Sequence, residues 1–191
     1  MNQLHERIIE ISKKHHLSHL GSNLTAVNII DEIYRIKKDD EPFVLSAGHS
    51  GLALYVVLEK YYKYYAEELY LKHGTHPHRD NNKIYCSTGS LGMGLGIAVG
   101  MALADREKNV YCLISDGECF EGSIYEAANV IRKYNITNLK VYLNFNGWSA
   151  YDSVPQWMLL NICTIFPEIS IRNTHVEDYE LKGLSAHYIT L

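Results

Sequence analysis

The chain has 191 residues, which is enough for one α/β domain with a sizeable core and too few for a second full domain. Its formal net charge of −4 comes without a long basic run, which argues against a nucleic-acid surface. No apolar stretch approaches the roughly 20 residues needed to cross a bilayer, and the mixed-charge N-terminus lacks a signal-peptide core.

The cysteine pattern indicates the redox environment of the protein. Cys86, Cys112, Cys119 and Cys163 lie in apolar or glycine-rich surroundings and show no CxxC or other zinc spacing. Such usage is typical of a reducing environment. We therefore expect a cytoplasmic protein with no membrane and no nucleic-acid partner.

The first third of the chain favours helices. Apolar positions at helical spacing predict a helix over 3–15, and Thr25 can cap a second helix over 26–36. A short buried strand is expected over 43–46, followed by a helix over 51–65.

The middle of the chain repeats the order strand, glycine-containing turn and helix. The first unit has its strand at 84–87 and its helix at 94–106, after a loop rich in histidine, glycine and proline. The second unit has its strand at 109–115 and its helix at 123–134. An apolar strand over 139–145 completes the pattern, which is typical of a parallel sheet.

The tail is expected to contribute one more helix, near 156–165, and strands near 169–172 and 187–190. We predict a single domain over 1–191 with an α/β fold. Its sheet is doubly wound and mostly parallel, with helices on both faces, and ligands should bind at the carboxyl ends of the strands.

Polar residues follow two neighbouring strands. Asp116 stands where a buried strand turns into a helix, Gly117 allows close backbone approach, and the helix start can take a diphosphate. Asn146 ends the next strand, so one crossover brings it beside Asp116. Carboxylate and amide oxygens, with a backbone carbonyl and diphosphate oxygens, suit Mg²⁺. Either residue alone fits a simple turn or helix cap equally well.

The segment ISDGECFEGSIYEAANVIRKYNITNLKVYLNFNGW resembles the thiamine-diphosphate motif of the transketolase family. That motif begins Gly-Asp-Gly and ends, one helix and one strand later, in Asn. The resemblance implies that Asp116 and Asn146 are Mg²⁺ ligands, with the Trp148 carbonyl as a third. The departure is Ser115, which replaces the first glycine and predicts weaker geometry.

The same resemblance implies further cofactor contacts. Gly117, Glu118 and Asn146 would contact thiamine diphosphate, and Glu121 would occupy the family's acidic position at the subunit interface.

A glycine-rich turn precedes the helix at 94–106. TGSLGMGLGIAVGMALA resembles the transketolase turn that holds the cofactor from its thiazolium side, with Gly89 and Leu91 at the matching positions. A structural helix start is the alternative, because glycines also let a helix pack tightly on a sheet. The spacing of a dinucleotide fingerprint is not met.

Three histidine segments also resemble the family. SHLGSNL, SAGHSG and GTHPHRD match its motifs in order, which implies that His19, His49 and His76 line the substrate channel and assist proton transfers. His49 would also contact the cofactor diphosphate. His187 is the expected counterpart of a further active-site histidine.

Other histidines have simpler interpretations. His15 and His16 are expected at the surface or at a helix cap. His73, His76 and His78 could instead form a zinc cluster, but their spacing on a loop is not that of a known set and the cysteines do not join it.

The resemblance covers about residues 5–150 and identifies the diphosphate-binding half of a transketolase-like enzyme. In this family the cofactor lies between that half and a pyrimidine-binding domain, for which the chain has no room. We therefore expect a split enzyme, whose separate partner subunit carries the pyrimidine-binding and C-terminal domains, assembled as a heterotetramer or homodimer. Its reaction would transfer a two-carbon ketol unit between sugars.

Two alternative functions stay open, and a third is disfavoured. One is a thiamine-dependent synthase or lyase acting on a 2-oxoacid or an unusual sugar. Another is a non-catalytic homologue that binds a partner, prompted by Ser115 and the short tail. A nicotinamide-dependent dehydrogenase is disfavoured: it needs an acidic residue about 20 positions after the glycine turn to hold a ribose, but Asp105 comes too soon and Asp116 lies at a strand end, where it has a better role.

Overall fold

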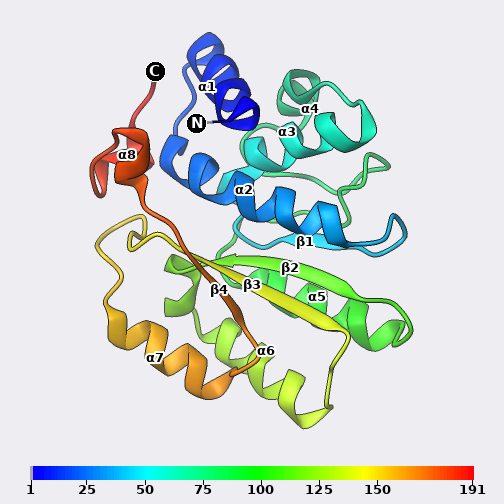
Figure 1. The fold of residues 1–191 in the computed structure, drawn as a ribbon. Helices are drawn as coiled ribbons and strands as arrows, with labels where there is room; N and C mark the ends of the chain where they lie inside the picture. Colours follow the sequence, from blue (N-terminus) through cyan, green and yellow to red (C-terminus); the bar gives the residue numbers. More distant parts are fainter. Residues whose placement is uncertain (1) are drawn as a thin grey trace.

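A parallel sheet organises the computed structural model, which describes residues 2–191. The four strands lie in the order β1-β2-β3-β4, which is also their order in the chain (Figure 1). Their bounds are Phe43–Leu45, Val110–Ser115, Leu139–Phe145 and Ser170–Asn173. Because all pairs are parallel, the carboxyl ends of the strands meet at one edge of the sheet.

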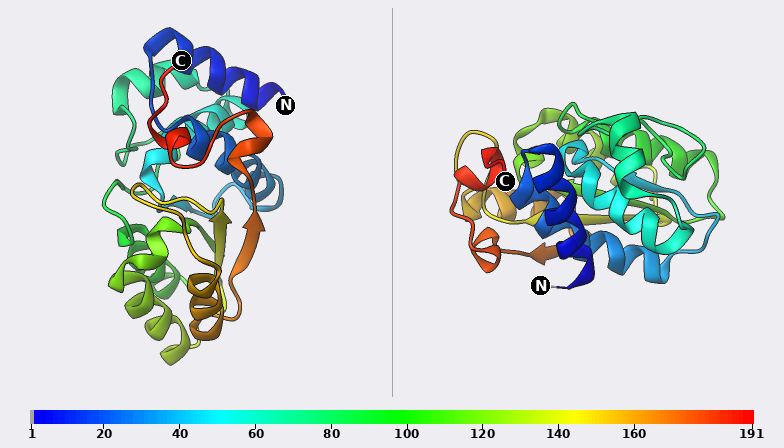
Figure 2. Two further views of the ribbon diagram at one scale, coloured as in Figure 1. Left: turned by 90° about the vertical axis from the view of Figure 1, so that its left-hand side faces the viewer. Right: turned by 90° about the horizontal axis from the view of Figure 1, so that it is seen from above.

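Helices cover both faces of the sheet, as Figures 1 and 2 show. One face carries α1 (Gln3–His15), α2 (Leu20–Ile36), α3 (Gly51–Tyr62) and α4 (Ala66–His73). The other carries α5 (Met93–Ala104), α6 (Gly122–Lys133) and α7 (Gln156–Ile165). A short helix α8 (Ser185–Tyr188) and the 3-10 turns η1 (Gly48–Ser50), η2 (Gly117–Phe120) and η3 (Val176–Tyr179) complete the elements.

The strand residues explain the two layers. Leu45 and Leu113 point into the core shared with α2 and α3, whereas Val44, Cys112 and Ile114 point into the core shared with α5 and α6. All five are buried, as expected for strands covered on both sides. The predicted α/β fold, with a parallel sheet between helical layers, is therefore confirmed.

Two helix boundaries differ from the prediction. The second helix begins at Leu20, and Thr25 lies inside it, where its hydroxyl donates to the Gly21 carbonyl at 2.9 Å. The predicted helix over 51–65 stops at Tyr62 because Lys63 adopts a left-handed conformation with φ of 58°. The chain restarts as α4, which was not predicted from the sequence.

Two predicted strands are wrong. Residues 84–87 belong to a loop that bonds to itself, with Asp80 N donating to Ile84 O at 3.1 Å and Thr88 N to Pro77 O at 3.2 Å. In the segment 187–190, residues 187 and 188 form the second half of the short helix α8, which packs its Ala186 closely on Gly21 of α2. Neither segment pairs with a strand of the sheet.

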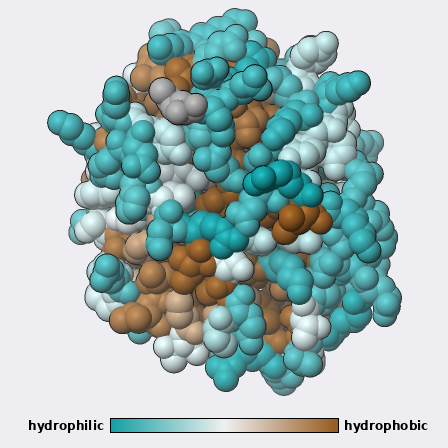
Figure 3. Space-filling model, viewed as in Figure 1, coloured by the Kyte–Doolittle hydropathy of each residue, from teal (hydrophilic) through white to brown (hydrophobic). Residues whose placement is uncertain are grey.

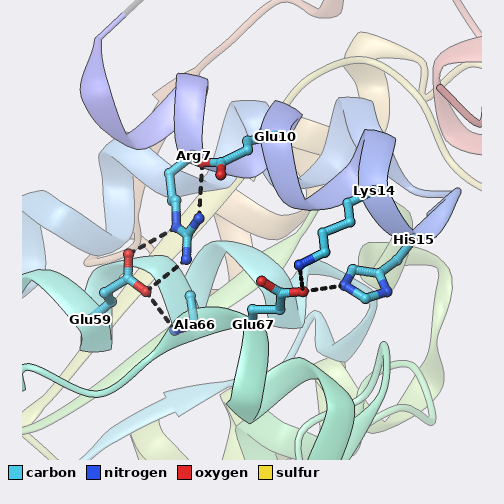
Figure 4. Close-up of polar contacts among 7 residues, drawn as sticks. All are labelled: Arg7, Glu10, Lys14, His15, Glu59, Ala66 and Glu67. Atoms are coloured by element: carbon cyan, nitrogen blue, oxygen red, sulfur yellow. Dashed lines mark hydrogen bonds and ion pairs between the residues drawn. The ribbon is translucent and has the colours of Figure 1, made fainter.

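Helix α1 is fastened to α3 and α4 by ion pairs (Figure 4). Arg7 Nε donates to Glu59 Oε1 at 3.0 Å, and Glu59 Oε2 accepts the free N–H of Ala66 at 2.7 Å. His15 Nε2 meets Glu67 Oε1 at 2.6 Å. These contacts fix the N-terminal layer. His16 is exposed at the C-cap of α1, as predicted, whereas His15 is half-buried and pairs with Glu67.

The surface is uneven in its polarity. On the face seen in Figure 1, apolar side chains gather over the lower half, where β4 and α7 lie (Figure 3). Helix α7 leaves Trp157 and Leu160 more than half exposed, at 55% and 68%. Within residues 2–191, no helix combines the length and apolar character needed to span a membrane.

Candidate active site

A cavity of about 160 Å³ lies at the carboxyl edge of the sheet, where β2 and β3 end. Every predicted site residue lines it except two, Glu118 and Glu121. Segments far apart in the chain, including the start of α2, the turn η1 and the C-terminal α8, contribute to it. The structure thus brings together residues whose proximity the sequence could only imply.

Asp116 is the central residue of this cavity. Its side chain is buried, and its Oδ2 accepts hydrogen bonds from the backbone N–H groups of Asn146 at 2.9 Å and Gly147 at 2.7 Å. Its Oδ1 accepts the N–H of Gly117 at 3.0 Å. One carboxylate therefore ties the end of β2 to the end of β3.

The electrostatic state of Asp116 follows from this setting. Burial raises the pKa of Asp116 to about 7, against the opposing effect of the N–H donors of Gly147, Gly117 and Asn146. Among the described residues, no lysine, arginine or histidine forms an ion pair with it. A buried carboxylate without a protein cation is suited to a bound metal ion.

Oxygen donors suitable for such an ion lie beside Asp116. Asn146 Oδ1 accepts one hydrogen bond, from Trp148 N at 2.9 Å, which leaves a second lone pair available. The Trp148 carbonyl belongs to the same turn, and Trp148 lines the cavity. A carboxylate, an amide oxygen and a backbone carbonyl fit a hard cation such as Mg²⁺.

The zinc interpretation of the other histidines finds no support. In the part of the chain that the structure describes, no three His, Cys, Asp or Glu side chains are grouped so as to hold a metal. His73 is buried and bonds through Nε2 to Asp80 Oδ2 at 2.8 Å, while His78 is exposed.

A cluster of histidines also lines the cavity. The ring centroids of His19 and His187 lie 4.6 Å apart, those of His49 and His187 5.4 Å, and those of His19 and His49 5.8 Å. Burial, with smaller contributions from the neighbouring rings, lowers the pKa of His19 to about 4 and that of His49 to about 3. Burial also lowers the pKa of His187.

The C-terminal segment builds part of this cluster. The backbone N–H of His19 donates to the His187 carbonyl at 2.8 Å, and His187 Nδ1 faces Ser22 Oγ at 3.4 Å. His19 occupies a left-handed conformation with φ of 63° at the start of α2. The tail therefore places His187 directly against the residue that opens α2.

The glycine turn lies against η1 at the cavity wall. A Cβ added to Gly48 would lie 2.8 Å from the Gly89 nitrogen, so the two backbones are in direct contact. Gly89 in turn faces the ring of His76, and Leu91 follows it in the cavity lining.

Glu118 and Glu121 lie outside the cavity. Glu118 is fully buried, and its carboxylate accepts hydrogen bonds from Ser46 Oγ, Gly92 N at 2.9 Å and Ser115 N at 2.8 Å. Glu121 lies beside Gly92, immediately before α6. Glu118 thus connects the strand ends to the glycine turn instead of facing a ligand.

Several cavity residues were not predicted from the sequence. Ser22, Ser115, Asn144, Ser149 and Ala150 line the cavity with the predicted residues. Two of them carried a signal: Asn144 is a polar side chain near the end of an otherwise apolar strand, and Ser115 stands at the first glycine position of the cofactor motif. The others could not be found without knowing how α2 and the turn after β3 approach each other.

Comparisons with known proteins define the class. The family model described as 1-deoxy-D-xylulose-5-phosphate synthase matches residues 1–161. One of the subunits of apulose-4-phosphate transketolase from Phocaeicola vulgatus is 34% identical over 175 residues, covering 81% of this chain and 62% of that one. Human transketolase is 37% identical over 127 residues, covering 61% of this chain and 20% of that one.

Solved structures agree on the fold. Transketolase from Campylobacter jejuni superimposes with a TM-score of 0.68 at 22% identity, covering 87% of this chain and 32% of that chain. Transketolase from Leishmania mexicana gives a TM-score of 0.67 at 19% identity, covering 86% and 31%.

The chain belongs to the transketolase family, as an N-terminal thiamine-diphosphate-binding domain. The family is one of thiamine-diphosphate-dependent transferases. The chain spans about three fifths of the P. vulgatus relative, 62%, and a fifth of human transketolase, 20%.

Proposed function

We propose that this chain binds thiamine diphosphate and Mg²⁺ as the N-terminal subunit of a split transketolase-like enzyme. With a partner subunit that carries the pyrimidine-binding and C-terminal domains, it would transfer a two-carbon ketol unit between sugars. The observation that carries the proposal is Asp116, a buried carboxylate without a protein cation that joins the ends of β2 and β3.

The chain's own groups have distinct tasks at the cofactor. Asp116, Asn146 and the Trp148 carbonyl would hold Mg²⁺, and Gly117 lets the backbone at the start of η2 approach the diphosphate. Gly89 and Leu91 would support the cofactor from the opposite wall. Bound thiamine diphosphate supplies the carbanion chemistry, and the protein supplies orientation and proton transfer.

The histidine cluster is suited to proton exchange with a sugar. His19 Nδ1 is engaged by Ser18 Oγ at 2.8 Å and His187 Nδ1 by Ser22 Oγ at 3.4 Å, so Nε2 is the free atom of each ring. Their lowered pKa values keep both rings neutral near pH 7, where an imidazole can accept a proton. His49 and His76 would bind hydroxyl and diphosphate groups beside them.

Three observations support a separate partner subunit. The cavity, at about 160 Å³, is smaller than the roughly 300–1,000 Å³ of complete small-molecule sites. The P. vulgatus relative is itself named as one subunit of its enzyme. Helix α7 leaves Trp157 and Leu160 exposed on an apolar face.

Calorimetric titration of thiamine diphosphate with Mg²⁺, in the presence of the partner, tests the cofactor site. We expect binding by the wild type and its loss in Asp116→Ala, because the metal loses its charged ligand. Asp178→Ala, at an exposed position in η3, should bind like the wild type. Absence of binding by the wild type would favour a non-catalytic, partner-binding homologue.

Mixing tests the split enzyme. The chain and its partner together should transfer ketol units from a ketose to an aldose, and neither should do so alone. Turnover of ketose by the purified chain with thiamine diphosphate would contradict the split model.

A second function is favoured by one observation, the match of residues 1–161 to the synthase family model. In that case the complex would act as a synthase or lyase on a 2-oxoacid or unusual sugar. Product analysis separates the two, because a 2-oxoacid donor releases CO₂ and a ketose donor does not.

A further inference from the structure

Thr25 is a buried hydroxyl beside the proposed metal ligands. It lies in the middle of α2 with 1% of its surface exposed, and its Oγ1 is 3.0 Å from Asn144 Nδ2 and 3.5 Å from Asn146 Nδ2. Asn144 and Asn146 both line the cavity, whereas Thr25 does not. The hydroxyl therefore meets both amide groups from behind the cavity wall.

The hydrogen bonds of this group form one consistent set of directions. Thr25 Oγ1 has one proton, and its neighbours Gly21 O at 2.9 Å and Ser22 O at 3.2 Å can only accept it. Its lone pairs must therefore accept, and only the NH₂ ends of Asn144 and Asn146 can donate to them. Each amide is thus held with its nitrogen toward α2.

Hydrogen bonds to the oxygen atom of each amide favour the same orientation. Trp148 N donates to Asn146 Oδ1 at 2.9 Å, and Thr174 Oγ1 donates to Asn144 Oδ1 at 2.6 Å. A flipped Asn146 would present its NH₂ group to the Trp148 N–H and its oxygen to the Thr25 lone pairs. Both contacts would be repulsive, so the network selects one orientation.

We propose that Thr25 is a positioning residue, which keeps Asn146 Oδ1 turned away from α2 and available to the metal ion of this site. The inference rests on the proposed function, in which Asn146 is a Mg²⁺ ligand. Groups that orient a metal ligand without touching the metal commonly change metal affinity about 10–100-fold when removed.

Manganese titration of the full chain together with its partner subunit, in the presence of thiamine diphosphate, tests this role. Mn²⁺ accepts the same oxygen ligands as Mg²⁺, and electron paramagnetic resonance of the free ion gives its dissociation constant directly. Thr25→Val keeps the shape and removes the hydroxyl, while Thr25→Ser keeps the hydroxyl. Asp116→Ala reports on the metal site itself.

We expect Thr25→Val to raise the Mn²⁺ dissociation constant about 10–100-fold and Thr25→Ser to stay within about threefold of the wild type. Equal affinity of Thr25→Val and the wild type would overturn the inference, as would equal weakening by the valine and serine variants. If the wild type binds no Mn²⁺, or Asp116→Ala binds as well as the wild type, the proposed metal site itself fails.

A thermal melt without metal separates positioning from general loosening. A loss of affinity in Thr25→Val that persists at temperatures well below its own midpoint supports positioning. A loss that appears only where the variant has begun to unfold contradicts it.

Discussion

Glu118 supports the site without facing it. Its two carboxylate oxygens accept from Ser46, Gly92 and Ser115, which joins the ends of β1 and β2 to the turn before α5. Burial raises the pKa of Glu118, and the hydrogen bonds from these three residues oppose that shift. Its position in the motif indicated cofactor contact, yet its contacts lie within the fold.

Substituting Glu118 should therefore affect stability directly. Glu118→Gln replaces one acceptor oxygen by an NH₂ group and leaves a buried donor unpaired. We expect the free energy of unfolding to fall by about 1–3 kcal/mol, measured by urea denaturation. Glu107→Gln, at an exposed position, should change it by less than about 0.5 kcal/mol. Equal effects of the two substitutions would contradict the tethering role.

Two buried tyrosines differ in the hydrogen bonding of their hydroxyl groups. Tyr34 Oη has no hydrogen-bond partner among the described residues, whereas Tyr55 Oη donates to the Gly74 carbonyl at 3.1 Å. Tyr34→Phe should raise the free energy of unfolding by about 1 kcal/mol or more, because an unsatisfied buried hydroxyl is removed. Tyr55→Phe should lower it by about 0.5–1.5 kcal/mol. Thermal denaturation of the two variants shows whether each one stabilises or destabilises the protein. Destabilisation by both substitutions would contradict the absence of a hydrogen-bond partner for Tyr34 Oη.

At the scale of elements, α5 meets the sheet through a glycine. A Cβ added to Gly94 would lie 2.5 Å from the Ser46 Cα, at the end of β1, whereas one added to Gly96 would have no neighbour within 4 Å. Both residues lie in the same helix. The first glycine is thus required for close approach and the second is not.

Alanine at these two positions should have opposite effects. Gly94→Ala forces the helix away from β1, and we expect a loss of more than about 2 kcal/mol, within the range of overpacked cores. Gly96→Ala should be neutral or stabilise by up to about 1 kcal/mol, because alanine favours the helix. Chemical denaturation measures both values. A stable Gly94→Ala protein would show that α5 can shift without cost.

The elements predicted well were those with a strong local pattern. The apolar runs that became β2 and β3 and the amphipathic α1 follow the expected ranges closely. Residues 84–87 carried the same apolar signal but have no strand beside them with which to pair. The helix breaks at Lys63 because this residue adopts a left-handed backbone conformation, which the sequence of a non-glycine residue rarely reveals.

Across the whole molecule, the site joins segments that the sequence keeps far apart. Asp116 and Asn146 could be placed together in advance, because one crossover links adjacent parallel strands. The approach of His187 to His19 and His49 could not be derived that way, since it depends on how the tail packs on α2. Packing of this kind is a tertiary property with no local signal.

The histidine cluster makes stability depend on pH with a definite sign. His49 and His19 have pKa values of about 3 and 4, below the usual 6.5, so between these values the unfolded chain binds protons that the folded chain does not. Their contribution is complete above pH 6.5 and is lost as the pH falls, toward 4 for His19 and toward 3 for His49. Through these two rings acid should destabilise the protein, whereas Asp116, whose pKa is raised to about 7, acts in the opposite sense over the same pH range.

Replacing the His49 imidazole should make the free energy of unfolding depend less steeply on pH. In His49→Gln, the slope of unfolding free energy against pH between about 5 and 6.5 should fall by roughly 1 kcal/mol per pH unit, which is somewhat less than the full value for one proton. Urea denaturation at several pH values measures the slope. His78→Gln, at an exposed position, should leave it unchanged. A His49→Gln slope equal to that of the wild type would mean that packing by the tail does not hold the rings in their neutral form.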